Sequence, residues 1–161
     1  DFINRLQTGC IRQVFAPDGS MWVGQTGRGW GSAGGKEFGL QQISWDGKTI
    51  PFSMFDLKLT AKGFQITFTK PVDRKLAEDL NNYNLERWGY HYHPKYGSPK
   101  TDLKKEKPTK GKVSKHGLIV KMETTLEITR VYRFHLEATF AKDGSKMSNT
   151  RAWYTLNRLK G

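Results

Sequence analysis

The sequence is poor in cysteine, in acidic residues and in long apolar runs. Cys10 is the only cysteine, which excludes an internal disulfide and a cysteine-rich zinc site. We expect this residue to be a small, buried hydrophobic side chain. No apolar run approaches the roughly 18 residues that a membrane helix requires, so no membrane span is predicted. Aromatic residues make up 12% of the 161 positions, which argues against a disordered chain.

Acidic residues are outnumbered by basic ones, and the excess is concentrated in one segment. The chain has 27 Lys and Arg against 15 Asp and Glu, a net charge of +12. Such a charge favours polyanionic partners: nucleic acid, acidic glycans or anionic membrane surfaces. Between residues 95 and 115, eight lysines face only Asp102 and Glu106, which leaves a local net charge of +6.

Residues 94–116 are therefore interpreted as a long, exposed basic loop, since they show no apolar periodicity. Most such loops are simply solvated, and the alternative is an electrostatic patch for a polyanion. The absence of a helix-turn-helix, zinc-finger or RNP motif disfavours nucleic acid as the specific partner. The predicted polyanion patch consists of Lys95, Lys100, Lys104, Lys105, Lys107, Lys110 and Lys112.

Alternation of apolar and polar residues predicts an all-β fold. Residues 64–68 and 132–138 place apolar side chains at every second position, as half-buried strands do. Turn sequences such as Pro17-Asp18-Gly19-Ser20 separate the predicted strands. Asp73 is suited to cap one short helix that ends near Leu80. The pattern predicts an antiparallel β-sandwich with little helix.

A change in composition near residues 50–60 predicts two parts. Glycine and tryptophan are frequent before it, and regular alternation dominates after it. We assign residues 1–54 to a first β segment built around a hairpin. Residues 55–161 are assigned to the sandwich, which carries the basic loop.

Three stretches resemble known bacterial proteins. The stretch GCIRQVFAPDGSMWVGQTGRGWGSAGGKEFGLQQISWDGK is similar to the last blade region of secreted sorbosone- and glucose-dehydrogenase-like β-propellers. The stretches FQITFTKPVDRKLAEDLNNYNLERW and VYRFHLEATFAKDGSKMSNTRAWYTLN resemble the opening and closing strands of a bacterial immunoglobulin-like module.

The resemblance implies the C-terminal region of an extracytoplasmic propeller protein, secreted or periplasmic, that carries one Ig-like module. Dehydrogenases of that class use pyrroloquinoline quinone. A cofactor pocket built from several blades cannot be complete in one blade. Neither the quinone nor any catalytic residue is therefore assigned to this chain, and the missing propeller domain is a possible partner.

Aromatic residues supply the candidate ligand-binding site. Positions 88–96 read WGYHYHPKY and hold four aromatic residues. Rings with polar tips stack on sugar faces or on single-stranded bases, and they serve equally well in core or interdomain packing. The glycine-rich stretch 26–36 lacks the following helix of a phosphate-binding loop. The predicted ligand-binding residues are Arg28, Trp30, Trp88, Tyr90, Tyr92 and Tyr96.

His91 and His93 share one face of the predicted strand 83–93, and a third ligand such as His116 or His135 would complete a copper or zinc site. No nucleophile elbow or carboxylate pair is visible, so no activity is expected of this chain alone. The leading hypothesis is a non-catalytic module that binds poly- or oligosaccharide in a carbohydrate-active or sugar-oxidising protein. The alternatives are a fragment of a quinone-dependent propeller dehydrogenase, a charge-driven polyanion binder and a structural spacer.

Overall fold

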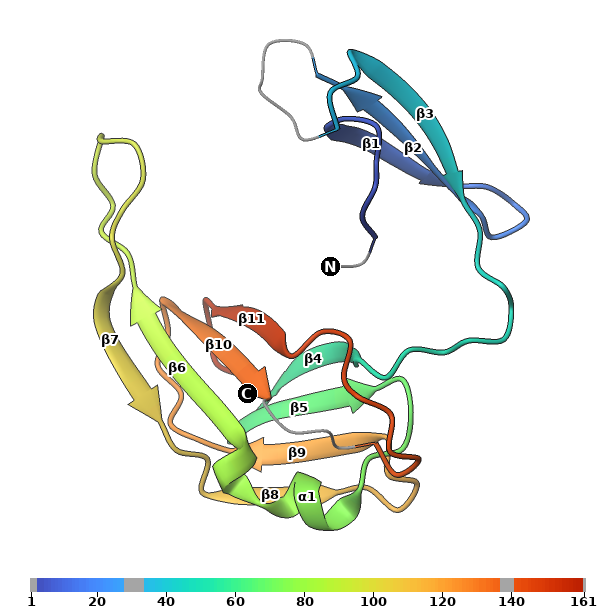
Figure 1. Ribbon diagram of the computed structural model, residues 1–161. Coiled ribbons are helices and arrows are strands. Elements are labelled where there is room, and N and C mark those ends of the chain that lie inside the picture. Colours follow the sequence, from blue (N-terminus) through green and yellow to red (C-terminus); the bar gives the residue numbers. More distant parts are fainter. Residues whose placement is uncertain (1–2, 28–33, 137–140, 161) are drawn as a thin grey trace. The chain divides into compact units, whose positions relative to one another are not determined.

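The computed structural model describes residues 3–27, 34–136 and 141–160 (Figure 1). Its contacts divide the chain into two compact units, Asp1–Thr49 and Ile50–Gly161. The boundary lies earlier than the predicted one at residue 54, because Phe52 is 1% exposed and belongs to the core of the second unit. Each unit is described by itself.

The first unit is a three-stranded antiparallel sheet in the order β1-β2-β3. Its strands are β1 (Cys10–Phe15), β2 (Met21–Thr26) and β3 (Phe38–Ile43). The predicted turn between β1 and β2 is confirmed: Asp18 accepts hydrogen bonds from the backbone N–H and the hydroxyl of Ser20, at 2.9 and 2.7 Å. Gly19 has φ +81°, which glycine adopts without strain. Cys10 is exposed at the start of edge strand β1, so its predicted burial is wrong.

The second unit contains two four-stranded sheets, in the orders β11-β10-β6-β7 and β4-β5-β9-β8. Every strand pair in these sheets is antiparallel. The elements are β4 (Met54–Thr60), β5 (Gly63–Phe68), α1 (Arg74–Glu78), η1 (Leu80–Asn82), β6 (Tyr83–Gly89), β7 (Thr101–Glu106), β8 (Lys110–Val113), β9 (Ile119–Glu123), β10 (Arg130–Leu136) and β11 (Arg151–Leu156).

The core of the second unit lies between these two sheets. Phe64 of β5 packs against Tyr132 and Phe134 of β10, with ring centroids 5.1 and 5.0 Å apart. It also meets Tyr154 of β11 at 5.4 Å. Because these rings come from opposite sheets, they join the two layers. The predicted alternation in β5 and β10 is confirmed, since Phe64, Ile66, Tyr132 and Phe134 are all buried.

One short helix closes an end of the sandwich, as the sequence predicts. The side chain of Asp73 accepts a hydrogen bond from the backbone N–H of Leu76 at 3.0 Å and so caps α1. Ala77 is the buried residue of α1, and its carbonyl accepts a 2.6 Å hydrogen bond from the hydroxyl of Tyr83. No helix among the described segments is long and apolar enough to cross a bilayer.

The predicted loop at 94–116 is wrong in its central part, where the chain forms β7 and β8. Both are edge strands, one in each sheet. Exposed edges carry charged residues on both faces, because lysines discourage pairing with other chains. The alternation that identifies a half-buried strand is therefore missing here.

The antiparallel β-sandwich, its single short α-helix and the additional N-terminal β segment are all present. Kinship with propeller blades and Ig-like modules stays a prediction.

Candidate functional site

The exposed aromatic residues of the second unit are concentrated in the hairpin that joins β6 to β7. Strand β6 ends at Gly89, earlier than the predicted 93. A Cβ at that position would lie 2.7 Å from Arg130 Nη1, so a larger residue would require this guanidinium to shift. Beyond it, Tyr90 is half exposed, and Tyr92 and Tyr96 are fully exposed. The hairpin projects past the ends of the strands (Figure 1).

Trp88 does not belong to this exposed group. Its side chain is 2% exposed, so its predicted role as an accessible ligand platform is wrong. The ammonium group of Lys100 lies 3.9 Å from the centroid of the indole ring, and the ring of Tyr90 meets it edge-on at 6.4 Å. These neighbours cover the indole and make Trp88 part of the hairpin's base.

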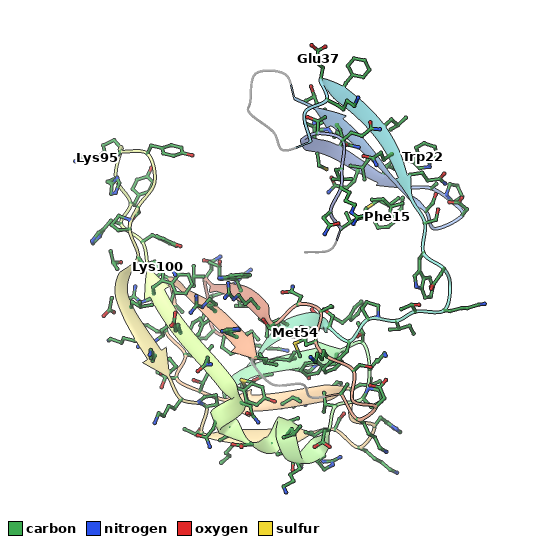
Figure 2. The ribbon with its side chains drawn as sticks, in the orientation of Figure 1. Phe15, Trp22, Glu37, Met54, Lys95 and Lys100 are labelled. Carbon is green, nitrogen blue, oxygen red and sulfur yellow. The ribbon has the colours of Figure 1, made fainter. Side chains whose placement is uncertain are left out.

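Polar contacts fix the base and the turn of the hairpin. Arg130 bonds Asp102 at 3.3 Å at the start of β7. The backbone N–H of His91 donates to the hydroxyl of Ser98 at 3.0 Å across the hairpin. Figure 2 shows Lys95 at the tip and Lys100 at the base. The exposed tyrosines therefore stand on a segment whose base is anchored.

The proposed histidine metal site is not assembled among the described residues. No group of three or more His, Cys, Asp or Glu side chains placed to hold a metal ion occurs within residues 3–27, 34–136 and 141–160. His93 Nδ1 accepts a 3.2 Å hydrogen bond from the backbone N–H of Lys95. This bond engages one ring nitrogen of His93 in the hairpin turn, and neither His116 nor His135 completes a site with this pair among the described residues.

The predicted polyanion patch is divided between several places. Lys95 lies at the hairpin tip, Lys104 and Lys105 on β7, and Lys110 and Lys112 on β8 in the other sheet. Lys104 contacts Asp102 at 3.5 Å and Lys110 contacts Glu123 at 3.4 Å. The lysines do not form one surface. Arg28 and Trp30 lie outside the described residues.

A row of side chains that sequence reasoning did not select crosses the outer face of the sheet that contains β6. Trp153 of β11 is paired with Arg133 of β10, Arg133 with Glu86 of β6, and Glu86 with Lys105 of β7. Directly paired residues of antiparallel strands project from the same face. Strands lie about 4.8 Å apart, so the row spans about 14 Å. Trp153 is 56% exposed.

Beside this row lies a cleft of 490 Å³. Arg133 and Glu86 are joined by a 2.8 Å ion pair within it, with side-chain exposures of 27% and 18%. Arg133 Nε is buried without a hydrogen-bond partner among the described atoms, so the pair does not use the whole guanidinium. The polar side chains that line the cleft are Asn81, Tyr83, Asn84, Glu86, Lys105, Glu106, Lys107, Arg133 and His135.

A buried ion network lies on the opposite side of the same sheet. Arg87 is 5% exposed and donates to Glu106 at 2.5 Å and to Glu127. Burial alone would lower the pKa of Arg87, but these two carboxylates raise it above its ordinary value. Burial also raises the pKa of the Tyr132 phenol nearby. Because Glu106 pairs inward, it adds little free negative charge to the cleft.

The sheet of the first unit leaves an apolar face uncovered within that unit. One face carries Val14, Trp22 and Leu40. Val14 pairs with Trp22, and Leu40 pairs with Gly24, which lies two residues after Trp22 on β2 and so on the same face. The exposed fractions of Val14, Trp22 and Leu40 are 63%, 36% and 66%. On the other face Val23 is buried, and Gln25 accepts a hydrogen bond from the backbone N–H of Thr8.

Comparisons with known proteins show a fold but no family. No protein-family model matches the sequence, and no curated protein matches it. The chain is similar to the crystal structure of the S-layer protein rSbsC(31-844), with a TM-score of 0.50 and 21% identity. The match covers 67% of this chain and 14% of that one. This likeness concerns the fold alone, over a small part of the other protein.

Proposed function

We propose that the second unit is a non-catalytic glycan-binding module of an extracytoplasmic protein that acts on or oxidises sugars. The observation that carries this proposal is the full exposure of Tyr92 and Tyr96 on a hairpin anchored at its base. Two large rings held in water gain nothing from the core. Their presence outside it is readily explained by a ligand that covers them.

Tyrosine suits such a ligand for two reasons. The ring offers a flat apolar face to the C–H patches of a sugar, and the hydroxyl stays hydrogen-bonded. A side chain with few rotatable bonds also loses little conformational entropy on binding. The anchors at Lys100 and Asp102 lower the cost of ordering the hairpin.

Two observations support the extracytoplasmic location. The stretches that resemble secreted propellers and Ig-like modules point outside the cytoplasm, and the fold is similar to part of an S-layer protein. The proposal assigns no cofactor to this chain, because a quinone pocket would need further blades.

Affinity electrophoresis tests the proposal directly. The full chain is run through native gels that contain one neutral or acidic polysaccharide at a time, at low salt and at about 0.2 M salt. We expect retardation that persists in salt and is lost in the Tyr92→Ala/Tyr96→Ala variant. Phe55→Ala is the matched control, because Phe55 is an exposed ring on β4 at 75% exposure. Equal retardation of both variants, or none of the parent protein, contradicts the proposal.

A second function is supported for the first unit. The uncovered face with Val14, Trp22 and Leu40 is what a propeller blade presents to its neighbour. We propose that this unit packs against a further β-sheet of a parent dehydrogenase-like propeller. Amide hydrogen exchange in β1 and β2 should be slower when the chain is part of the parent propeller than when it is alone. Equal exchange rates in the two proteins would contradict this assignment.

A further inference from the structure

We propose that the outer-face cleft of the sandwich is a second binding site, and that it takes an acidic oligosaccharide. It is separate from the tyrosine hairpin. The inference rests on the proposed function only for the class of ligand, a sugar. Two features of the cleft argue for a charged ligand, a fixed guanidinium and lysines without ion pairs, and an exposed indole lies beside the cleft on the neighbouring strand.

The indole supplies the stacking surface. Trp153 is 56% exposed and lies beside Arg133 on the neighbouring strand. Strand pairing holds both residues on a rigid sheet, where a platform is better fixed than on a loop. A sugar ring on Trp153 would therefore direct its next unit over Arg133 and Glu86.

The charges in the cleft favour a carboxylate. Glu86 neutralises Arg133 at 2.8 Å, and Glu106 is held by Arg87 at 2.5 Å. Lys105 and Lys107 form no ion pair with any described residue and are both exposed. The lining therefore keeps an excess of positive charge that one or two carboxylates would neutralise.

The acceptors in the cleft favour a sugar over a nucleic acid. Glu86 and Asn84 present oxygen atoms beside the lysines. Carboxylate and amide oxygens accept hydrogen bonds from hydroxyl groups, which every sugar ring carries and single-stranded DNA largely lacks. Sites for single-stranded nucleic acid combine a positively charged groove with several stacking rings, and the described row has one ring.

Isothermal titration calorimetry on the full chain tests the inference, with tri-galacturonate as the acidic probe and a neutral trisaccharide as its control. We expect Lys105→Ala/Lys107→Ala to weaken binding of tri-galacturonate by about tenfold or more, since it removes the two cations of the cleft that have no ion pair among the described residues. Trp153→Ala should weaken it similarly. The matched control is Lys110→Ala/Lys112→Ala, which removes the same charge from β8 and should leave the affinity unchanged.

The outcomes separate this inference from the hairpin proposal. Loss of binding in the Tyr92→Ala/Tyr96→Ala variant alone would support the hairpin and overturn the cleft. An equal loss of affinity in both double-lysine variants would show that net charge alone causes binding, and would overturn the cleft as a site. Competition by a single-stranded DNA oligonucleotide at equal affinity would overturn the sugar assignment. Far-ultraviolet circular dichroism of each variant verifies that it is folded.

Discussion

Arg87 is the residue on which the interior of the second unit depends most. Its guanidinium is 6% exposed and pairs with Glu106, which is 13% exposed, and with Glu127. Removing one partner of a buried pair leaves the other charge without compensation. The network links β6, β7 and the segment before β10, so its loss would destabilise all three parts of the sheet.

We therefore expect Arg87→Ala to lower the free energy of unfolding by about 3–5 kcal/mol. Urea denaturation followed by tryptophan fluorescence measures the change. The double variant Arg87→Met/Glu106→Leu should lose less, because the two most buried charges are removed together and Glu127 keeps its ion pair with Arg130 at 2.6 Å. A double variant that is no more stable than Arg87→Ala would contradict this account of the network.

Asp143 gives a pH-dependent prediction. Its carboxylate accepts hydrogen bonds from the side chain and backbone of Ser145, and Lys70 contacts it at 3.1 Å; together they lower its pKa to about 2. A depressed folded-state pKa stabilises the protein above the unfolded value of 3.8, and this contribution is lost as the pH falls toward 2.

Carboxyl-detected NMR titration should accordingly give Asp143 a midpoint near 2. Ser145→Ala should move the midpoint upward, because it removes the first of these bonds. A midpoint at the ordinary aspartate value in the parent protein would show that this turn is not formed.

Trp153 shows how much of the site could have been found from sequence. The alternation of Ala152, Tyr154 and Leu156 predicts the last strand, and the same rule places Trp153 on its outer face. What the sequence does not contain is the pairing partner. Arg133 and Glu86 become its neighbours only through strand order, which depends on long-range packing. Trp88 was misassigned because nothing local indicates that Lys100 covers it.

At the scale of elements, α1 is held by its cap more than by its length. It has five residues, and isolated helices of that size are unstable. Asp73→Ala should lower the free energy of unfolding by about 1 kcal/mol, while Asp73→Ser should be nearly neutral. Thermal denaturation of both variants measures this. If Asp73→Ser were destabilised as much as Asp73→Ala, the role of Asp73 would not be helix capping.

The edge strands β7 and β8 mark the limit of prediction from periodicity. Strands β5 and β10 are central in their sheets, and burial of one face gives them a regular pattern. Strands β7 and β8 have one neighbour each and many exposed lysines. Most of their side chains face solvent at a sheet edge and few are buried, so the sequence of these strands resembles that of a loop.

At the scale of the whole molecule, the two units differ in the apolar surface that they bury. The core of the second unit joins both of its sheets, whereas Val23 is the one described apolar residue of the first unit that is fully buried. Since apolar burial is the main stabilising term, native-state hydrogen exchange should show low protection in β1–β3 and high protection in β5, β6 and β10. Equal protection in both units would contradict this difference.

The central claim is that the sandwich is a sugar-binding body with defined contact residues. An NMR titration of the ¹⁵N-labelled chain with a galacturonate trisaccharide tests it most directly. The account predicts saturable shifts confined to the hairpin around Tyr92 and Tyr96 and to the row from Trp153 to Lys105. Shifts that spread over the lysines of β8 and vanish with salt, or no shifts at all, would contradict it.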